Sequence, residues 1–304
     1  MEWNSKMLKG IHFLLTYTCN YTCDHCFLYC SPKSQGTFTI KQIREVLGEA
    51  TKIGTVEWIY FEGGEPFLYY PIMVEGIRLA KKEGFKVGIV TNSYWATSIE
   101  DAELWLKALA KLEIDNLSVS NDTFHYENVD ESLSKIAEKA SKNLRLPVGT
   151  ICIDEPTVKI DGTKEKGEPI IGGGAMFKGR AVETLIKDLP KRPWEELTEC
   201  PYEDFKGLGR IHIDPFGNTH ICQGLSIGNF WDTPLSELIK NYNVDSHPIC
   251  RPLDQGGPAQ LVKEFDIEHE DQYVDACHLC FLTRLKLIDK FPKYLTPKQV
   301  YGIE

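Results

Sequence analysis

Cysteines gather near the start of the chain in a spacing that suits a metal centre. Cys19, Cys23 and Cys26 form a C-x3-C-x2-C pattern, in which three thiolates can converge on one metal ion or cluster. Zinc is one candidate, with His25 or Cys30 as the fourth ligand of a closed tetrahedral site. Because the first residues contain no apolar run long enough for a signal peptide, we expect a cytoplasmic protein. Clustered cysteines there indicate metal or redox chemistry rather than disulfides.

A second group of cysteines occupies the last third of the sequence. Cys277 and Cys280 form a C-x2-C pair, and Cys200 and Cys222 precede them. Four thiolates suit a zinc ion and an iron–sulfur cluster equally well, so the residues alone leave both possibilities open. Cys250 is a fifth candidate, as an alternative ligand or as a free thiol near the site.

The elements that must position these residues alternate between strand-like and helix-like segments as far as residue 152. Strands are predicted at 11–16, 56–61, 86–91, 116–120 and 147–153, and helices at 40–52, 70–83, 98–112 and 129–143. This order indicates parallel strands with helical crossovers, in an open or closed α/β barrel. In such folds the active-site groups lie at the carboxyl ends of the strands.

Polar and glycine-rich residues follow the predicted strands at that end. The first three cysteines come directly after the first strand, and Glu62–Pro66 (EGGEP) follows the second. Its two glycines allow the backbone to approach a ligand closely. Thr91 and Asn92 end the third strand and Ser118–Asp122 (SVSND) the fourth, where turn formation is the alternative explanation of their polar side chains.

The cysteine spacing after a first strand, followed by GGEP after the second, resembles the radical S-adenosylmethionine (SAM) superfamily. In that family three cysteines hold a [4Fe–4S] cluster, and SAM occupies the open position of its fourth iron. The resemblance implies a partial (β/α)6 TIM-like barrel over residues 1–190. It also implies reductive cleavage of SAM to a 5′-deoxyadenosyl radical, which abstracts hydrogen from a carbon centre of the substrate, with the cofactors supplying the difficult chemistry.

The resemblance further assigns SAM-binding roles at the strand ends. The GGEP turn is implied to bind the amino group of SAM, and the next two strand ends its ribose hydroxyls and carboxylate. His25 stands where the family usually has an aromatic residue, and Ile153 is implied to contact adenine unless it is a core residue. His125, close behind Asp122, is a candidate catalytic residue. The candidate cofactor-binding residues are His25, Phe27, Gly63, Gly64, Glu65, Asn92, Ser120, Asp122 and Ile153.

The C-terminal cysteines resemble the auxiliary-cluster extensions of the same family, the SPASM type and its short twitch form. These extensions share a sequence pattern: a cysteine, then a G-x4-C run on a hairpin, then further cysteines downstream. Here the G-x4-C run ends at Cys222 on a predicted hairpin. The resemblance implies a small α+β domain over residues 191–304, with helices near 234–241 and 282–290. A second, auxiliary [4Fe–4S] cluster would be held by Cys200, Cys222, Cys277 and Cys280. Cys250 is a catalytic candidate, because a free thiol in the cavity could donate hydrogen as an epimerase needs.

A glycine-rich stretch links the two cysteine groups. Residues 154–174 are predicted to form a long loop, followed by Lys178 and Arg180. These two cations could bind a substrate carboxylate or phosphate. A loop that closes the barrel mouth is the alternative.

Charge and hydropathy limit the partners. A formal net charge of −10 disfavours general nucleic-acid binding, which depends on phosphate neutralisation. No uncharged apolar stretch is long enough for a membrane span. The resemblance implies a flavodoxin- or ferredoxin-type electron donor, and an auxiliary cluster that transfers electrons or binds substrate, as in an oxidoreductase.

The substrate class stays open at this stage, between a small molecule and a peptide. Few residues precede the first strand, so the peptide-recognition domain of many peptide-modifying members is not expected, which favours a small molecule. A ribosomal-peptide epimerase, or an enzyme that makes thioether or carbon–carbon crosslinks, is the alternative within the family. From another class, the chain could be an iron–sulfur electron carrier or a zinc-stabilised binding module.

Overall fold

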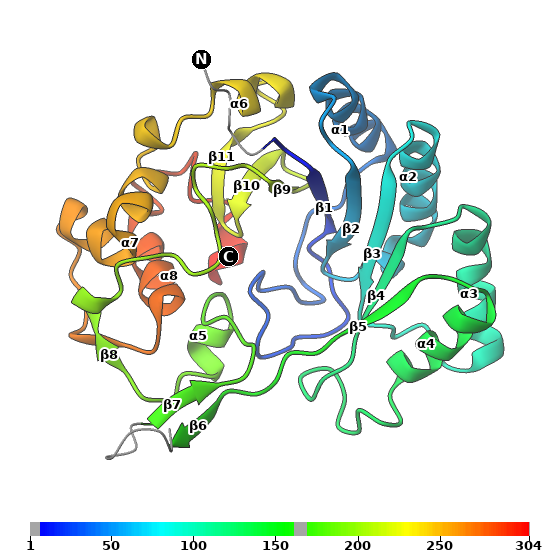
Figure 1. The fold of residues 1–304 in the computed structure, drawn as a ribbon, viewed down its shortest axis with the longest axis horizontal. Coiled ribbons are helices and arrows are strands. Elements are labelled where there is room, and N and C mark those ends of the chain that lie inside the picture. The colour runs from blue at the N-terminus through cyan, green and yellow to red at the C-terminus, as the bar shows by residue number, and fades with distance from the viewer. Residues whose placement is uncertain (1–6, 161–168, 304) are drawn as a thin grey trace.

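The computed structural model describes residues 7–160 and 169–303, and a single eight-stranded sheet runs through it (Figure 1). Its strands are β1 (Gly10–Thr16), β2 (Trp58–Gly63), β3 (Lys86–Thr91), β4 (Asn116–Ser120), β5 (Val148–Ile151), β9 (Arg210–Ile213), β10 (Asn218–Cys222) and β11 (Leu225–Asn229). The strand order is β11-β10-β9-β1-β2-β3-β4-β5. Strands β1 to β5 are parallel, β9 is parallel to β1, and β10 is antiparallel to both of its neighbours.

The α/β class and the partial TIM-like barrel are confirmed. The five predicted strands all form, and the predicted hairpin ending at Cys222 forms as β9 and β10. The sixth parallel strand is β9, which comes late in the chain and pairs with the free edge of β1. The sheet therefore crosses the boundary predicted at residue 190, and the division into two domains stays a prediction.

Helices cover the outer side of strands β1 to β5, and a second group of helices lies beyond β9 (Figure 1). The first group is α1 (Ile40–Ile53), α2 (Tyr70–Lys82), α3 (Ile99–Lys111) and α4 (Leu133–Asn143), and the later helices are α5 (Ala181–Thr184), α6 (Leu235–Asn241), α7 (Cys250–Phe265) and α8 (Ala276–Leu287). Short 3-10 helices are η1 (Pro66–Tyr69), η2 (Trp194–Glu196), η3 (Val244–Ser246) and η4 (Lys298–Tyr301). Across the ranges that the structure describes, none of the helices combines the length and apolarity that crossing a bilayer requires.

One sequence prediction in the later part of the chain was wrong, and one helix there was not predicted. The predicted loop at 154–174 contains two paired strands, β6 (Thr157–Ile160) and β7 (Pro169–Gly172), and its middle at 161–168 lies outside the described residues. A second small pair is β8 (Arg192–Pro193) with β12 (Gln272–Tyr273). Helix α7 was missed because Gly256, Gly257 and Pro258 interrupt its pattern, and the first two of these have non-helical backbone angles.

Capping residues in the sequence set the ends of the helices. The Thr39 side chain caps α1 in a reciprocal capping box with Gln42, and Gly54 ends that helix with φ of 72°. The hydroxyls of Ser98 and Ser132 cap α3 and α4 by accepting a hydrogen bond from the N–H of Asp101 and of Lys135. These side chains bind backbone N–H groups that have no partner within the helix. They therefore fix the residues at which the helices between the strands begin.

Alternate side chains of β1 enter two different cores. Ile11, Phe13 and Leu15 pack on the helix side of the sheet, with the residues of α1 to α4. Leu14 points the other way, into a second core that includes Leu253 of α7 and residues of α8. Because side chains alternate along a strand, β1 separates the helix layer from an interior in which the cysteine loops and the C-terminal helices meet.

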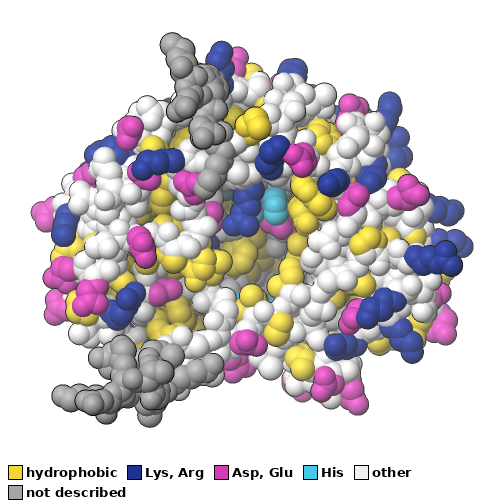
Figure 2. All heavy atoms as spheres, in the orientation of Figure 1, with side chains coloured by type: hydrophobic (Ala, Val, Ile, Leu, Met, Phe, Trp, Pro, Cys, Tyr) yellow, Lys and Arg dark blue, Asp and Glu magenta, His cyan; other side chains and the backbone are white. Residues whose placement is uncertain are grey.

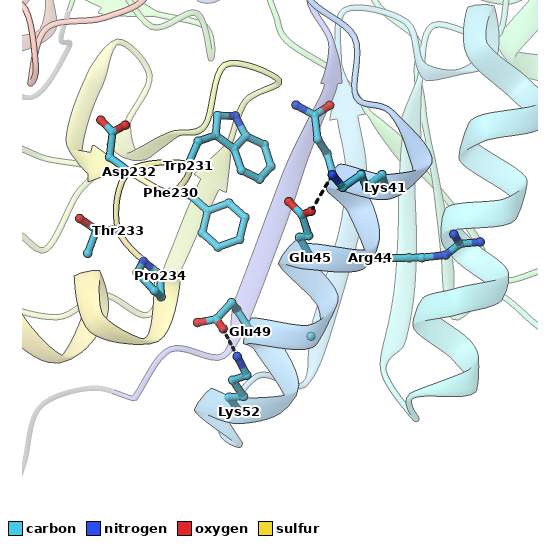
Figure 3. A pocket seen from close by; sticks show the side chains of 12 residues that line it. Lys41, Arg44, Glu45, Glu49, Lys52, Phe230, Trp231, Asp232, Thr233 and Pro234 are labelled. Carbon is cyan, nitrogen blue, oxygen red and sulfur yellow. Dashed lines mark hydrogen bonds and ion pairs between the residues drawn. The ribbon is translucent and has the colours of Figure 1, made fainter.

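Helix α6 in the C-terminal part of the chain also contacts helix α1, beside an open surface pocket of about 600 Å³ (Figure 3). Glu49 of α1 accepts hydrogen bonds from the backbone N–H and the hydroxyl of Ser236, at 3.0 and 2.6 Å, and pairs with Lys52 at 2.5 Å. None of the predicted site residues lines this pocket. It serves here as a contact between the late helices and the barrel.

Candidate active site

The N-terminal cysteines lie on a loop that leaves the carboxyl end of β1. Cys19, Cys23 and Cys26 line one pocket of about 280 Å³. Burial raises the pKa of the Cys19 and Cys23 thiols to about 12, whereas hydrogen bonds from Cys30 lower the pKa of Cys26 to about 6. Binding to a cation would offset the burial cost of the thiolates. The structure thus brings the three predicted ligands to one cavity.

The glycine turn after β2 is joined to this loop through the backbone. The N–H of Gly64 donates to the carbonyl of Thr16 at 2.7 Å, and the N–H of Glu65 donates to the carbonyl of Thr18 at 3.0 Å. A Cβ at Gly63, whose φ is +121°, would lie 2.5 Å from the Thr16 oxygen, and one at Gly64 would lie 2.2 Å from the Thr18 oxygen. Only glycine permits this approach, which sets the glycine turn against the cysteine loop.

Glu65 has a different place from the one expected. Its side chain is fully buried and accepts hydrogen bonds from the N–H of Phe67, the hydroxyl of Thr91 and the N–H of Asn92, at 3.0, 2.8 and 2.7 Å. Burial raises its pKa to about 7. Glu65 does not line the pocket, so the geometry makes it a positioning residue for the end of β3. It holds Asn92, whose side chain donates to Asn20 at 2.9 Å.

A histidine–carboxylate group forms the wall beyond β4. His125 Nδ1 lies 2.7 Å from one carboxylate oxygen of Asp122, and the other oxygen accepts from the N–H of Ile153 at 3.2 Å. Burial raises the pKa of Asp122, but the His125 contacts outweigh it and lower the value overall. His25 stacks on Phe124 with ring centroids 4.5 Å apart, and burial lowers its pKa to about 4.

The pocket contains every predicted cofactor-binding residue except Glu65. It also contains His125 and several residues that the sequence prediction missed. Tyr21 lies inside the cysteine loop and Glu62 directly before the glycine turn, so proximity to a motif was the available signal for both. Met176 follows the glycine-rich segment and had no comparable signal. The predicted residues that line the pocket are His25, Phe27, Gly63, Gly64, Asn92, Ser120, Asp122, His125 and Ile153.

Arg180 clamps the cysteine loop. Its guanidinium donates to the carbonyls of Cys23 and Cys30 at 2.7 Å each, and its backbone N–H donates to the carbonyl of Cys26 at 3.0 Å. The guanidinium also lies over the ring of Tyr29, 5.0 Å from its centroid. These contacts point to a structural role for Arg180 in place of the predicted substrate contact.

Lys178 faces the second cysteine site. Its ammonium donates to the side-chain oxygen of Gln223 at 2.8 Å and lies 3.6 Å from Cys222 Sγ. The side chain is buried, and its ammonium lies 5.3 Å from the centroid of the Phe27 ring. Lys178 does not line the pocket of Cys19, Cys23 and Cys26, which is called the SAM-side pocket because the sequence resemblance implies SAM there. The geometry therefore does not support the predicted substrate role.

The four predicted C-terminal ligands share one small cavity. Cys222 ends β10, Cys277 and Cys280 lie in the first turns of α8, and Cys200 faces them from the preceding loop. The same cavity is lined by Lys178 and Arg284. Two cations in a buried cavity need an anionic partner, and a cluster or a zinc ion held by four thiolates would supply one.

Cys250 lies apart from both cavities. It is the first residue of α7 and is fully buried, and burial raises its pKa to about 12. The Tyr242 hydroxyl is its hydrogen-bond partner. Cys250 lines neither the SAM-side pocket nor the four-cysteine cavity. Its predicted role as a hydrogen donor therefore has no support from this geometry.

Comparison with known proteins agrees with the first site. The model of the radical SAM superfamily matches residues 13–146, a range that includes the cysteine loop, the glycine turn and the ends of β3 and β4. Over this range the chain is a member of the radical SAM superfamily. Members of this family use a [4Fe–4S] cluster and SAM, and the three cysteines and the neighbouring pocket are the residues that would hold them.

Two relatives are similar in sequence to about two thirds of the chain. The putative peptide biosynthesis protein YydG of Bacillus subtilis (strain 168) is 27% identical over 64% of this chain and 65% of its own length. The tungsten-containing aldehyde ferredoxin oxidoreductase cofactor-modifying protein of Pyrococcus furiosus is 32% identical over 69% and 58%. The chain thus spans roughly three fifths of the length of each of these two relatives. A solved structure of BtrN in complex with AdoMet and 2-DOIA aligns at 16% identity and a TM-score of 0.49, over 78% of this chain and 84% of that chain.

The cysteine sulfurs are spread more widely than the ligands of a single metal ion. Within residues 7–160 and 169–303, no three cysteine sulfurs all lie within 4.8 Å of one another. Thiolates at about 2.3 Å from one zinc would be only about 3.8 Å apart. A cluster holds its thiolates farther apart, because each binds a different iron. This spread is wider than one zinc ion with thiolate ligands requires.

We predict that Gly64→Ala disrupts the first site. The added methyl group would collide with the backbone oxygen of Thr18, so the turn and the cysteine loop must separate. The expected result is SAM affinity at least about tenfold lower, since more than 1.4 kcal/mol is lost when such a contact fails. Equilibrium binding of SAM to the anaerobically reconstituted protein measures this. Gly48→Ala is the matched control, because nothing lies within 4 Å of a Cβ there, and equal losses in both variants would refute the prediction.

We predict that Arg180→Met lowers the iron content of the N-terminal site and the melting temperature. The change removes two charge-assisted hydrogen bonds to the loop carbonyls, each worth about 1.5–3 kcal/mol. Iron analysis and thermal unfolding measure the effect. Arg78→Met is the control, since its partner Glu75 lies on the same exposed helix face and such pairs contribute little. Full iron content with only a raised KM for substrate would instead restore the substrate-binding hypothesis.

Proposed function

We propose that this radical SAM chain cleaves SAM reductively and uses the resulting 5′-deoxyadenosyl radical to abstract hydrogen from a carbon centre of its substrate. The observation that carries the proposal is the shared pocket. Three cysteines, two close-packed glycines and the polar ends of β3 and β4 all line it. An electron carrier or a zinc-stabilised module needs no such cavity beside its metal ligands.

The residues of this pocket would each have a simple task. The N-terminal cluster, when bound, supplies one electron to SAM. Gly63 and Gly64 leave room for the amino group of SAM beside the cysteine loop, and Phe27 and Ile153 offer apolar surface to the adenine. Asp122, held by His125 and by the backbone, presents a fixed carboxylate at the same wall.

Asn92 and Ser120 complete the proposed SAM site. Both line the pocket at the ends of neighbouring strands, and both offer groups that can hydrogen-bond a ribose or a carboxylate. Glu65 supports this arrangement from behind, because it fixes the N–H of Asn92 and the hydroxyl of Thr91. His125 is retained as a catalytic candidate, since it lines the same pocket and is oriented by Asp122.

We propose that the four C-terminal cysteines hold a second [4Fe–4S] cluster in a domain of residues 191–304. The support is their common cavity and its two buried cations, Lys178 and Arg284. Lys178 also lies over Phe27, which follows Cys26 of the first site. This proximity favours electron transfer between the substrate and the second cluster, and hence an oxidoreductase.

For the substrate and the electron donor, we propose only a chemical class. We propose a small-molecule or peptide substrate, and the similarity to a protein named for peptide biosynthesis favours the peptide. A peptide epimerase or crosslinking enzyme is therefore the second candidate function. We propose a flavodoxin- or ferredoxin-type donor for the first cluster, because its chemistry requires a reductant of low potential.

Cleavage of SAM provides the direct test of this function. The anaerobically reconstituted protein, incubated with SAM and dithionite, should release 5′-deoxyadenosine, as measured by chromatography. Cys23→Ala should abolish the product, because one cluster ligand is lost. Cys152→Ala is the matched control and should retain it, since Cys152 is exposed and lines neither cavity. A cluster-loaded wild-type protein that releases none would contradict the proposal.

The second cluster should respond to its buried cations. Lys178→Met is expected to lower the midpoint potential of that cluster by on the order of 100 mV, because reduction adds negative charge that the ammonium stabilises. A redox titration followed by electron paramagnetic resonance (EPR) measures the change at unaltered iron content. Lys206→Met removes an exposed lysine paired with Asp254 and should change nothing. Equal potentials in all three proteins would exclude a role for Lys178.

A further inference from the structure

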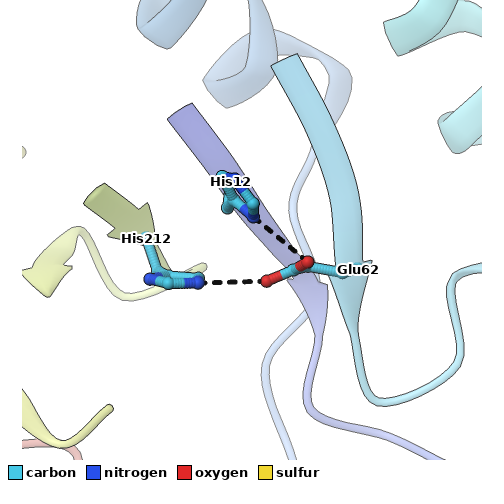
Figure 4. A group of neighbouring side chains, drawn as sticks. All are labelled: His12, Glu62 and His212. Atoms are coloured by element: carbon cyan, nitrogen blue, oxygen red, sulfur yellow. Dashed lines mark ion pairs between the residues drawn. The ribbon is translucent and has the colours of Figure 1, made fainter. Parts of the chain in front are cut away.

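A second group of metal-ligating side chains lies inside the barrel. His12 of β1, Glu62 of β2 and His212 of β9 point toward one another (Figure 4). His12 Nδ1 lies 3.1 Å from one carboxylate oxygen of Glu62, and His212 Nε2 lies 3.2 Å from the other. One ligand atom of each residue lies within 4.8 Å of the other two. Two imidazoles and one carboxylate form a ligand set that divalent transition metals bind.

The backbone makes this grouping a rigid one. β1 pairs with both β2 and β9, and His12 and His212 are direct partners in the register. The His12 ring also stacks on Tyr60, with centroids 4.7 Å apart and an interplanar angle of 17°. Tyr60 fits because Gly88 has no side chain, since a Cβ there would lie 2.2 Å from the Tyr60 ring. The imidazoles are thus held in place before any ligand binds.

The contact between His12 and Glu62 does not have the geometry of a hydrogen bond. His12 Nδ1 is buried and has no hydrogen-bond partner, although the Glu62 oxygen is 3.1 Å away. His212 Nδ1 is also buried without a partner. A hydrogen bond requires the N–H to point at the oxygen, whereas metal ligands point at a common centre. Ligands about 2.1 Å from one metal lie about 3.0–3.4 Å apart, and both contacts have that length.

The group is reachable from the SAM-side pocket. Glu62 lines that pocket as well as contacting both histidines. The side chains of His12, Glu62 and His212 are 16%, 20% and 4% exposed. Figure 2 shows a hollow in the middle of the molecule that contains histidine and cationic side chains. A bound ion would therefore have an open side toward the cavity.

We propose that His12, Glu62 and His212 bind a divalent transition-metal ion, such as Zn²⁺, Fe²⁺ or Mn²⁺, at the base of the pocket. Three protein ligands leave at least one position open, as in catalytic metal sites. That position would hold an oxygen or nitrogen atom of the substrate and so orient the carbon that loses hydrogen. The site is separate from both cysteine groups, and its existence does not depend on SAM cleavage.

Manganese binding tests the site on the cluster-loaded protein. Mn²⁺ is the probe because it prefers oxygen and nitrogen ligands to thiolates. Free Mn²⁺ is followed by its EPR signal at room temperature, with the clusters oxidised. We expect one saturable Mn²⁺ per chain, at least tenfold weaker binding in Glu62→Gln and in His212→Ala, and displacement of Mn²⁺ by Zn²⁺. Unchanged iron content and circular dichroism in both variants would show that they fold.

Control variants separate this site from others. His269→Ala should bind Mn²⁺ as the wild type does, because His269 contacts the carbonyl of Glu270 near the surface. His125→Ala tests the other group of possible ligands, His25, Asp122 and His125. The proposal is overturned if the wild type shows no saturable binding at millimolar Mn²⁺. It is equally overturned if binding is lost in His125→Ala and retained in Glu62→Gln. Either result leaves the proposed SAM cleavage untouched.

Discussion

The N-terminal cysteine loop has to be held from outside, because it contains no helix or strand of its own. Two contacts do this from opposite sides. The glycine turn after β2 hydrogen-bonds its start through Gly64 and Glu65, and Arg180 binds three carbonyls further along. Unpaired backbone groups in a buried loop would be costly, so these partners stabilise the loop without using the thiols. The rest of the site is arranged around a loop fixed in this manner.

The segment that holds the loop also reaches the second cysteine site. Lys178 contacts Cys222, Gly179 packs against the carbonyl of Cys26, and Arg180 clamps the loop that carries Cys23. A side chain at Gly179 would come within 2.6 Å of the Cys26 oxygen. Three consecutive residues therefore contact both cysteine sites.

The parts of this site that could be predicted from the sequence are those whose interactions join residues close together in the chain. The strand ends were predictable, because the apolar segments are local and parallel strands place their carboxyl ends at one edge. The partners of Arg180 were not, since Cys23 lies 157 positions away and nothing local indicates which carbonyls a guanidinium will meet. The pairing of β9 with β1 is a similar long-range choice. The position of Glu65 in the glycine turn was predictable from the local sequence. The direction of its side chain was not, because it depends on the distant residues Thr91 and Asn92.

The charge of Glu62 inside the barrel has to be balanced, and this requirement helps to explain the residues around it. Barrel interiors are usually filled with apolar side chains, yet Glu62 stands there between two histidines. Burial raises the pKa of a carboxyl, but His12 and His212 outweigh it and hold the pKa of Glu62 well below its usual value. Burial lowers the pKa of His212 to about 4, because a charged imidazole loses its hydration there. A buried carboxylate is expensive unless it has a cationic partner. A divalent ion, or a positively charged part of the substrate, would remove that cost, and each would bring the substrate to the face of the pocket where SAM is expected.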